Sequence, residues 1–443
     1  MTMKNLTKIM MVSGMVLSLS ACETAGKIFG DEPERILPGE RISVLSYQNE
    51  TTPEPVLSVS QLHIPQMWQN KFWPQNGGYP NHAMGHLTLN GDLDKLWSSK
   101  VGKGSTKRRP LITVPVAADN MVFAMDLNAR LTAFSMDKGK KLWNVKLIPE
   151  GEEKGSNVGG GIAYAQGHLF ASTGYHNVVS LNPQNGEVLW ETTVGTPVRA
   201  APTVAHDKVF VVTLDNRLIA LDAKTGQTAW DYTGYEETTN LLGAPSVAVD
   251  KNVVIAAFSS GEVVAFRAEN GKTLWTENLS SLSQKNTLTA IADIRAMPVM
   301  DKGLVFVGNF GGKLVALDER SGRRVWQKNI GTAQTMWTAG NAVFLITTDQ
   351  ELIALSRDSG DIFWVRPLRK AQDEKEPSLW HGPILAGGRL LTVSNQGKVL
   401  EINPKTGELL AKWKTGQEHV SRPFVADQKL IMQSAAGKLM TYQ

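Results

Sequence analysis

Short apolar runs separated by turn residues recur along most of the chain. The segment Leu304–Trp326 contains an apolar run, an Asn-Phe-Gly-Gly turn, a second run, a Ser-Gly turn and a third run ending in tryptophan. The segment Lys208–Trp230 repeats this order with an Asp-Asn turn. A further apolar segment precedes each unit, as at 201–205, so each unit is predicted to hold four strands. No stretch after the N-terminal segment keeps a 3.6-residue apolar period, which argues against helices.

A tryptophan closes each of these units. Most of these tryptophans follow a glycine by four residues, and the first and last follow one by six, which keeps the side chain on the same strand face. The series is Trp97, Trp143, Trp190, Trp230, Trp275, Trp326, Trp364 and Trp413. Four-stranded units repeated about every 45 residues are typical of propeller blades. We expect each indole to wedge between adjacent blades, as a structural group and not a ligand-binding one.

The two ends of the repeat region complement each other. The residues after Trp413 suffice for three strands but lack the tryptophan-bearing one, whereas Asp92–Lys100 supplies one such strand without partners. Joining them completes an eighth blade and removes exposed edge strands. The predicted fold is therefore all-β, an eight-bladed propeller of four-stranded antiparallel blades closed by strands from both termini. The aromatic, turn-rich lead-in Trp68–His86 is expected to pack on the bottom or rim.

The first 22 residues have two lysines, no acids and an apolar run at 9–19. That run is too short to span a bilayer and fits the core of a secretory signal. The sequence Leu-Ser-Ala-Cys at 19–22 resembles a bacterial lipobox, which implies cleavage before Cys22 and acylation of this cysteine, the only one in the chain. The alternative is a plain signal peptide with a chance cysteine. We expect a lipoprotein signal at 1–21, a lipidated tether at 22–60 and the propeller at 61–443.

Composition and motifs narrow the chemistry. A formal net charge of +4 gives no strong footprint for nucleic acid. The histidines are scattered, with His82 and His86 expected in turns or on the surface, and no calcium loop is present. The glycine-rich stretch Gly155–Gly167 lacks the P-loop pattern, and the basic cluster Lys103–Pro110 is interpreted as a solvated loop in preference to a phosphate site. We expect no catalytic residues, cofactor or metal.

The turn-and-tryptophan pattern has a known parallel. Ala220, Asp222, Thr225, Gly226 and Trp230 match the pattern A-x-D-x-x-T-G-x-x-x-W, which resembles the tryptophan-docking repeat of quinoprotein dehydrogenases. This resemblance raises the alternative of a quinone-dependent alcohol or sugar dehydrogenase. Many members of that group carry a vicinal cysteine pair in the cofactor site, and this chain has none.

The lipobox, the eight repeats and the single cysteine together resemble the BamB family, the lipoprotein subunits of the outer-membrane β-barrel assembly (BAM) machinery. The resemblance implies a non-catalytic scaffold anchored by lipid at the periplasmic face of the outer membrane. Such a scaffold binds a POTRA domain of the barrel subunit BamA and assists the folding and insertion of nascent outer-membrane proteins. The rival outside this family is a periplasmic propeller that binds a small ligand or peptidoglycan fragment at its central channel.

The same resemblance suggests a partner site on two neighbouring inter-blade loops. The family's Leu-x-Leu-Arg segment before Ala-Pro corresponds here to Asn240, Leu241 and Leu242, where leucines are kept but the arginine is not. The family's Asp-x-Asp segment corresponds to Asp293-Ile-Arg295, with arginine in place of the second aspartate. We expect these segments to lie on adjacent loops of one face. Inter-blade linkers with buried leucines are the alternative for both.

Overall fold

Strands make up nearly all the regular structure of the described residues. The computed structural model describes residues 51–53, 59–153, 155, 157, 159–235, 243–280, 293–368, 378–418 and 421–443. Every regular element is a strand except a three-residue 3-10 helix, η1 (Val59–Gln61). The described residues belong to the second of two compact units, Asn49–Gln443.

The strands group into eight sheets of four, which we number as blades 1 to 8. Blades 1 to 4 contain β2 (Val116–Ala118), β3 (Met121–Met125), β4 (Arg130–Ser135) and β5 (Lys141–Lys146); β6 (Gly160–Ala165), β7 (His168–Thr173), β8 (Asn177–Leu181) and β9 (Val188–Thr193); β10 (Thr203–Ala205), β11 (Lys208–Val212), β12 (Arg217–Asp222) and β13 (Thr228–Thr233); β14 (Ala248–Asp250), β15 (Val253–Ala257), β16 (Glu262–Arg267) and β17 (Thr273–Asn278). Blades 5 to 8 contain β18 (Val299–Asp301), β19 (Leu304–Gly308), β20 (Leu314–Asp318) and β21 (Arg324–Lys328); β22 (Trp337–Ala339), β23 (Ala342–Ile346), β24 (Glu351–Ser356) and β25 (Ile362–Pro367); β26 (Trp380–Ala386), β27 (Arg389–Ser394), β28 (Lys398–Ile402) and β29 (Leu409–Lys414); and β30 (Phe424–Ala426), β31 (Lys429–Gln433), β32 (Lys438–Tyr442) and β1 (Lys95–Lys100).

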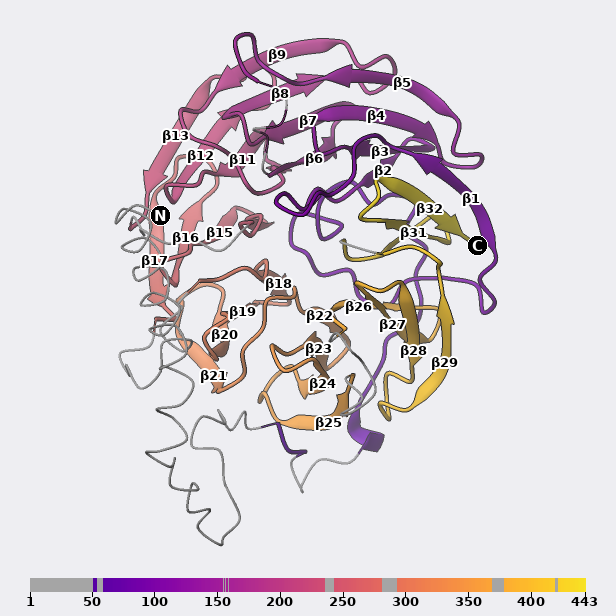
Figure 1. Ribbon diagram of the computed structural model, residues 1–443. Coiled ribbons are helices and arrows are strands. Elements are labelled where there is room, and N and C mark those ends of the chain that lie inside the picture. The colour runs from indigo at the N-terminus through magenta and orange to yellow at the C-terminus, as the bar shows by residue number, and fades with distance from the viewer. Residues whose placement is uncertain are drawn as a thin grey trace, which may run out of the picture. The chain divides into compact units, whose positions relative to one another are not determined.

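Each blade is an antiparallel meander that runs from an inner strand to an outer one, and the blades form a ring (Figure 1). The second strand of a blade is buried throughout, as in β3, or in all but its first residue, as in β7, whereas the outer strand β5 has exposed and partly buried residues. This pattern fits an outer strand with one face against the neighbouring blade and the other in solvent. In blade 8, β1 pairs with β32, with Lys95 opposite Tyr442. The predicted eight-bladed propeller is confirmed.

Seven of the repeat tryptophans contact the next blade in the same way. Each indole N–H donates to a backbone carbonyl just before that blade's last turn, over 2.8–3.1 Å, in the pairs Trp97–Met136, Trp143–Pro183, Trp190–Ala223, Trp230–Ala268, Trp275–Glu319, Trp326–Arg357 and Trp364–Pro404. The turn glycine lies against the ring. At Gly271, which has φ of +70°, an added Cβ would come within 2.6 Å of Trp230. The repeat spacing therefore joins the glycine of one blade to the tryptophan of the blade before it.

Trp413 makes a different contact. A register shift after Glu401 places Ala411 where the other blades have their docking tryptophan, so Trp413 lies two residues further along β29. Its indole donates 2.9 Å to the Glu401 carboxylate, and its ring lies 5.1 Å from that of Tyr442. Trp413 differs because the next blade, blade 8, is the one closed by the two ends of the chain. Its third and fourth strands are joined by reciprocal backbone hydrogen bonds between Gln443 and Asp94 and not by a glycine turn, so no turn glycine is there for the indole to pack against.

The N-terminal lead-in, which continues in the structure to Leu89, contacts the inner strands of all eight blades. Its backbone or side chains hydrogen-bond to each of them, through the pairs Asn70–Val425, Trp73–Ala117, Pro74–Tyr164, Gln75–Val204, Pro80–Val249, Asn81–Met300, Gly85–Trp337 and Leu87–Leu385. It runs among the inner strands in the middle of the ring (Figure 1). Of the two expected places, the rim is excluded, since the lead-in lies at the inner strands and ties them together.

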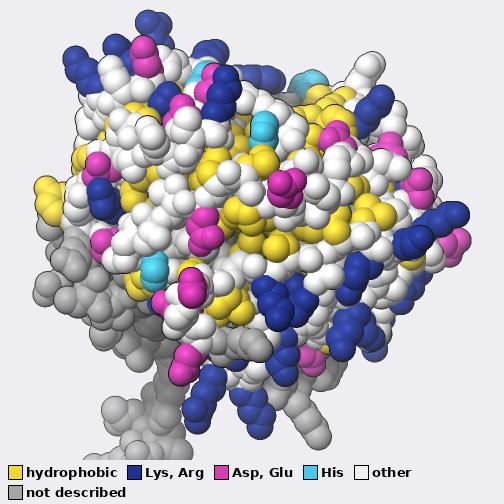
Figure 2. Space-filling view, turned by 90° about the horizontal axis from the view of Figure 1, so that it is seen from above, with side chains coloured by type: hydrophobic (Ala, Val, Ile, Leu, Met, Phe, Trp, Pro, Cys, Tyr) yellow, Lys and Arg dark blue, Asp and Glu magenta, His cyan; other side chains and the backbone are white. Residues whose placement is uncertain are grey.

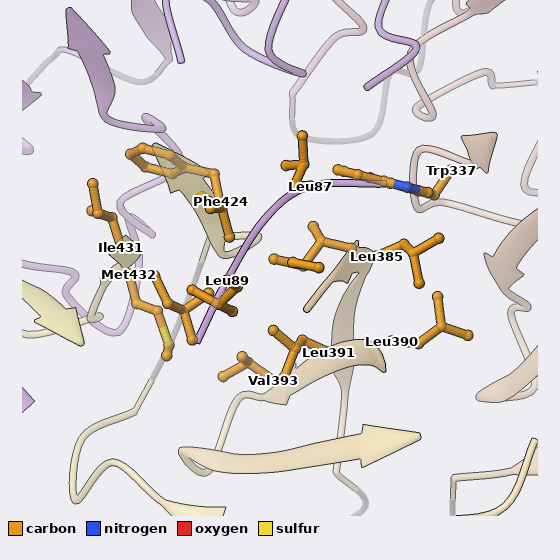
Figure 3. Packing of buried hydrophobic residues seen from close by; sticks show 14 of the residues in the cluster. Leu87, Leu89, Trp337, Leu385, Leu390, Leu391, Val393, Phe424, Ile431 and Met432 are labelled. Atoms are coloured by element: carbon orange, nitrogen blue, oxygen red, sulfur yellow. The ribbon is translucent and has the colours of Figure 1, made fainter. Parts of the chain in front are cut away.

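Apolar packing secures the end of the lead-in. Leu87 and Leu89 are buried in a cluster shared by blades 6, 7, 8 and 1, with Leu385, Trp337 and Phe424 around them (Figure 3). Burying a leucine side chain contributes about 1.5–3 kcal/mol. The lead-in is thus part of the core of this unit.

Candidate partner-binding site

Three of the predicted partner residues, Asn240, Leu241 and Leu242, lie outside the described residues. The predicted lipidation site, Cys22, also lies outside them. Asp293 and Arg295 lie in the connection between β17 of blade 4 and β18 of blade 5. We call this connection, 279–298, the second loop, and the connection between β13 and β14, 234–247, the first loop. Both loops leave outer strands at the same edge of their blades.

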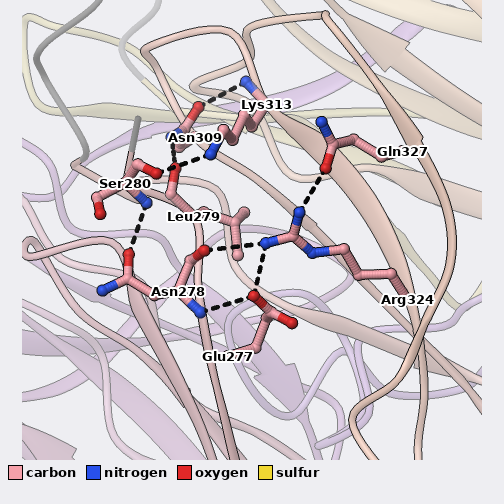
Figure 4. Close-up of polar contacts among 8 residues, drawn as sticks. All are labelled: Glu277, Asn278, Leu279, Ser280, Asn309, Lys313, Arg324 and Gln327. Carbon is pink, nitrogen blue, oxygen red and sulfur yellow. Dashed lines mark hydrogen bonds and ion pairs between the residues drawn. The ribbon is translucent and has the colours of Figure 1, made fainter. Parts of the chain in front are cut away.

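Two consecutive residues of blade 5 hold the two ends of the second loop. The Asn309 side-chain amide donates 3.0 Å to the carbonyl of Leu279, and the Phe310 backbone N–H donates 3.1 Å to the carbonyl of Asp293. The Lys313 ammonium adds a 2.7 Å bond to the carbonyl of Ser280 (Figure 4). The hairpin between β19 and β20 therefore fixes the base of this loop.

Arg324 reinforces the start of the second loop from the side. Its guanidinium pairs with the Glu277 carboxylate at 2.6 Å and donates 3.1 Å to the carbonyl of Asn278 (Figure 4). It also donates 2.7 Å to the Gln327 side chain. The Arg324 guanidinium thus joins blade 5 to the last residues of β17. Arginine suits this role because its planar group carries several N–H donors in a fixed arrangement.

The first loop has a similar support in blade 3. The Asn216 carbonyl accepts from the Gly234 N–H at 2.9 Å, and the Asn216 side-chain amide donates 2.7 Å to the carbonyl of Tyr235. The Tyr235 backbone is therefore held while the residue is 70% exposed. Sequence reasoning missed Tyr235. The available signal was a tyrosine in the polar stretch that follows β13, because tyrosine is enriched among residues that dominate interfaces.

Described residues of the two loops meet. An added Cβ on Gly243 would come within 3.5 Å of an Arg295 guanidinium nitrogen. Gly243, Ala244 and Pro245 line a cavity of about 20 Å³ together with Asp293 and residues of blade 3. That volume holds little more than one water molecule, so the seam is closely packed where the structure describes the two loops.

The acid and base of the second loop are less exposed than a rim pair would be. Asp293 is only 5% exposed, and its part in partner binding stays a prediction. Arg295 is partly buried, and this burial lowers the pKa of its guanidinium while the charge of Asp293 opposes the shift. Their charges are therefore tied to the loop's own structure.

Two histidines of the lead-in bind backbone carbonyls through their side chains. The sequence placed His82 and His86 in turns or on the surface; His82 closes a turn through its backbone N–H bond to Tyr79, His86 lies at a bend, and both side chains are buried. His82 donates 2.7 Å to the carbonyl of Pro298, and burial lowers its pKa to about 4. Among the described residues, no group of three or more His, Cys, Asp or Glu side chains could hold a metal ion. No described helix is long and apolar enough to cross a bilayer.

The fold and the repeat contacts define a class, the eight-bladed propellers with quinoprotein-type tryptophan docking. The family model described as "Outer membrane protein assembly factor BamB" matches residues 128–366 and 370–443. The chain belongs to this family.

Individual relatives agree with this assignment. The chain is 26% identical over 353 residues to the outer membrane protein assembly factor BamB of Yersinia pestis, covering 79% of this chain and 88% of the relative. It is 27% identical over 345 residues to the BamB of Escherichia coli, and the match covers 77% of this chain and 86% of the relative.

Solved structures share the fold at low identity. BamB from Moraxella catarrhalis superposes with a TM-score of 0.68 at 19% identity, over 80% of this chain and all of that one. Quinohemoprotein alcohol dehydrogenase from Comamonas testosteroni superposes with a TM-score of 0.63 at 14% identity, over 87% and 83%. Because the fold is common to an assembly factor and a dehydrogenase, function has to be argued from the sites.

Proposed function

We propose that this protein is a non-catalytic scaffold subunit of the BAM machinery. In this proposal residues 1–21 are the lipoprotein signal, residues 22–60 form a tether acylated at Cys22, and the propeller of 61–443 faces the periplasm at the outer membrane. The two loops bind a POTRA domain of BamA, and the scaffold thereby assists folding and insertion of β-barrel proteins. Family membership supports the assembly role.

The observation that carries the proposed binding site is the meeting of Gly243 and Arg295. Their loops enter different blades, about fifty residues apart, yet they share one packed seam. The exposed ring of Tyr235 lies on a backbone that Asn216 holds. A held backbone reduces the ordering cost of binding, and an exposed aromatic offers area that a partner can bury.

The rival functions have less support. The lead-in contacts every inner strand, so a small ligand reaching those residues has to displace a segment that is part of the core. A dehydrogenase needs a cofactor site, and family membership points instead to an assembly factor. A retained small molecule or quinone chromophore in the purified protein would favour these alternatives.

The test is co-purification from detergent-solubilised envelopes with Tyr235→Ala combined with Leu241→Asp. We expect this double variant to lose the barrel subunit while its thermal unfolding stays close to wild type. Asp293 is left unchanged because a buried lysine there would destabilise the loop. Leu142→Asp, at a 47% exposed position on β5 of blade 1, is the matched control and should co-purify normally. Normal co-purification of the double variant would place the interface elsewhere.

A further inference from the structure

Three neighbouring blades carry like charges directly opposite each other at the same place. In blades 7, 8 and 1 the first residue of the third strand and the last residue of the fourth strand are both cations, and they lie directly opposite each other. These pairs are Lys398–Lys414, Lys438–Lys100 and Arg130–Lys146. We call these six residues the basic arc. It follows the outer edge of the propeller on the side of the inter-blade loops.

Other blades do not repeat this feature. The corresponding cross-strand pairs of blades 2, 3, 4 and 6 are Asn177–Thr193, Arg217–Thr233, Glu262–Asn278 and Glu351–Pro367, and the ladder of blade 5 ends there with Leu314–Lys328. In blade 3, Arg217 is neutralised by Asp231 at 3.0 Å, whereas in blade 1 the equivalent partner of Arg130 is the neutral Asn144 at 2.7 Å. The charge of the arc is therefore a property of this sector and not of the repeat.

Within the part of the chain that the structure describes, no ion pair involves Lys100, Arg130, Lys146 or Lys438. Like charges directly opposite in an antiparallel pair destabilise a sheet. An external anion bound across the pairs would relieve this repulsion. Lys and Arg side chains also gather toward the lower right of Figure 2, which views the propeller from the side of β5 and β9.

A cavity of about 620 Å³ lies at the junction of blades 8 and 1 within this sector. Four cations line it, Lys100, Lys103, Arg130 and Lys146, against one acid, Asp126. The Asp126 carboxylate accepts backbone N–H bonds from Lys103, Asn128 and Arg130, each at 2.9 Å, so it is used to hold the wall. Lys103 belongs to the cluster that the sequence assigned to a solvated loop. The fold brings it beside cations from other strands.

A second cavity, of about 440 Å³, lies at the other end of the arc between blades 6 and 7. Its cations are Lys398, Lys412, Lys414 and Arg366, and its apolar lining includes Leu400, Leu409 and Trp413. Cations beside an apolar surface suit an amphiphilic anion better than a purely hydrophilic one. This combination favours a phospholipid over an acidic protein segment.

We propose that the basic arc binds the phosphate headgroups of an anionic lipid surface. Each lysine or arginine close to such a surface strengthens association severalfold, through an attraction that salt screens. The arc lies on blades 7, 8 and 1, whereas the proposed partner loops lie on blades 3 to 5. The two sites are therefore separable by mutation, and failure of one leaves the other standing.

The experiment uses the chain from Glu23 onward, without the signal segment and Cys22, so that neither an apolar signal nor an acyl group contributes; the compact unit Asn49–Gln443 is kept whole. The partition of this chain onto phosphatidylcholine vesicles with and without phosphatidylglycerol is measured at low and high salt. The test variant is Arg130→Gln with Lys146→Gln. The matched control is Arg267→Gln with Lys272→Gln, which removes the same charges from exposed positions of blade 4. Circular dichroism and thermal unfolding verify that all three proteins are folded.

We expect wild type and control to bind the anionic vesicles, to release at high salt and to ignore pure phosphatidylcholine. The test variant should bind at least tenfold more weakly. Equal binding by test and control variants would overturn the proposal. Binding of soluble pyrophosphate without vesicle binding would indicate a free-anion site instead, and binding of polyglutamate without vesicle binding would indicate an acidic protein partner. Both outcomes would also overturn it.

Discussion

The contact between Trp230 and Gly271 allows a quantitative test of how the blades hold together. Trp230 packs between Phe210 and Phe266, with ring centroids 5.7 and 5.9 Å away, and donates to the carbonyl of Ala268. Replacing a large buried aromatic by alanine costs about 3–5 kcal/mol. Because Trp230 is only partly buried, we expect Trp230→Ala to fall near the lower end of that range.

Gly271→Ala acts on the same contact from the other blade. Its positive φ of +70° costs an alanine about 1–2 kcal/mol, and the new Cβ at 2.6 Å from the indole adds about 1–3 kcal/mol of overpacking. In a Trp230→Ala background the second cost disappears. The double variant should therefore be less destabilised than the sum of the single variants, by about 1–3 kcal/mol.

Gly303→Ala provides the matched control. Gly303 has φ of +84°, but an added Cβ there would meet nothing within 4 Å, so only the backbone cost applies. Its effect should add to that of Trp230→Ala without coupling. The assay is urea unfolding followed by circular dichroism, which does not depend on the altered tryptophan. Strict additivity in the Trp230–Gly271 cycle would refute the docking account.

Three further predictions concern anchoring, closure and pH. Cys22→Ala should leave a precursor that no longer fractionates with the outer membrane, and an unchanged mature mass and fractionation would disprove lipidation. Deleting Lys438–Gln443 removes β32, so β1 and β31 lose their shared partner; we expect aggregation or loss of soluble protein, and native-like unfolding of the shortened chain would contradict the shared blade. Burial lowers the pKa of His82 to about 4, so the native state keeps it neutral while the unfolded state takes up a proton below its usual pKa of 6.5. Stability from this residue is therefore present above pH 6.5 and lost as pH falls toward 4, by up to about 3 kcal/mol, and His82→Gln should show a shallower fall in a pH series of urea unfolding. Identical slopes for wild type and variant would assign the effect to other groups.

The repeat made most of the fold predictable from sequence. Turn glycines, alternating strands and periodic tryptophans are local signals, and each blade uses them in the same way. The departure at Trp413 was not readable, because its cause lies at the seam, where Tyr442 and the N-terminal strand replace a glycine turn. The path of the lead-in was hidden for a similar reason, since its hydrogen bonds to the inner strands reach residues between 44 and 355 positions away.

The sites were less predictable because they depend on register and burial. Nothing in the sequence places Lys100 opposite Lys438, although that pairing creates one third of the basic arc. The burial of Asp293 likewise follows from packing against blade 3 and the hairpin of blade 5. Tyr235 is exposed while its backbone is bonded, and a sequence pattern carries no information on that combination.

The most direct test of the proposed scaffold role is site-specific photo-crosslinking in intact envelopes. A photoreactive amino acid replaces Tyr235 in one strain and Leu142 in another, and the crosslinked partners are identified by mass spectrometry. Our account predicts a crosslink from position 235 to a POTRA domain of the barrel subunit and none from position 142. Crosslinks to that subunit from position 142 alone, or from neither position while the complex remains intact, would contradict it.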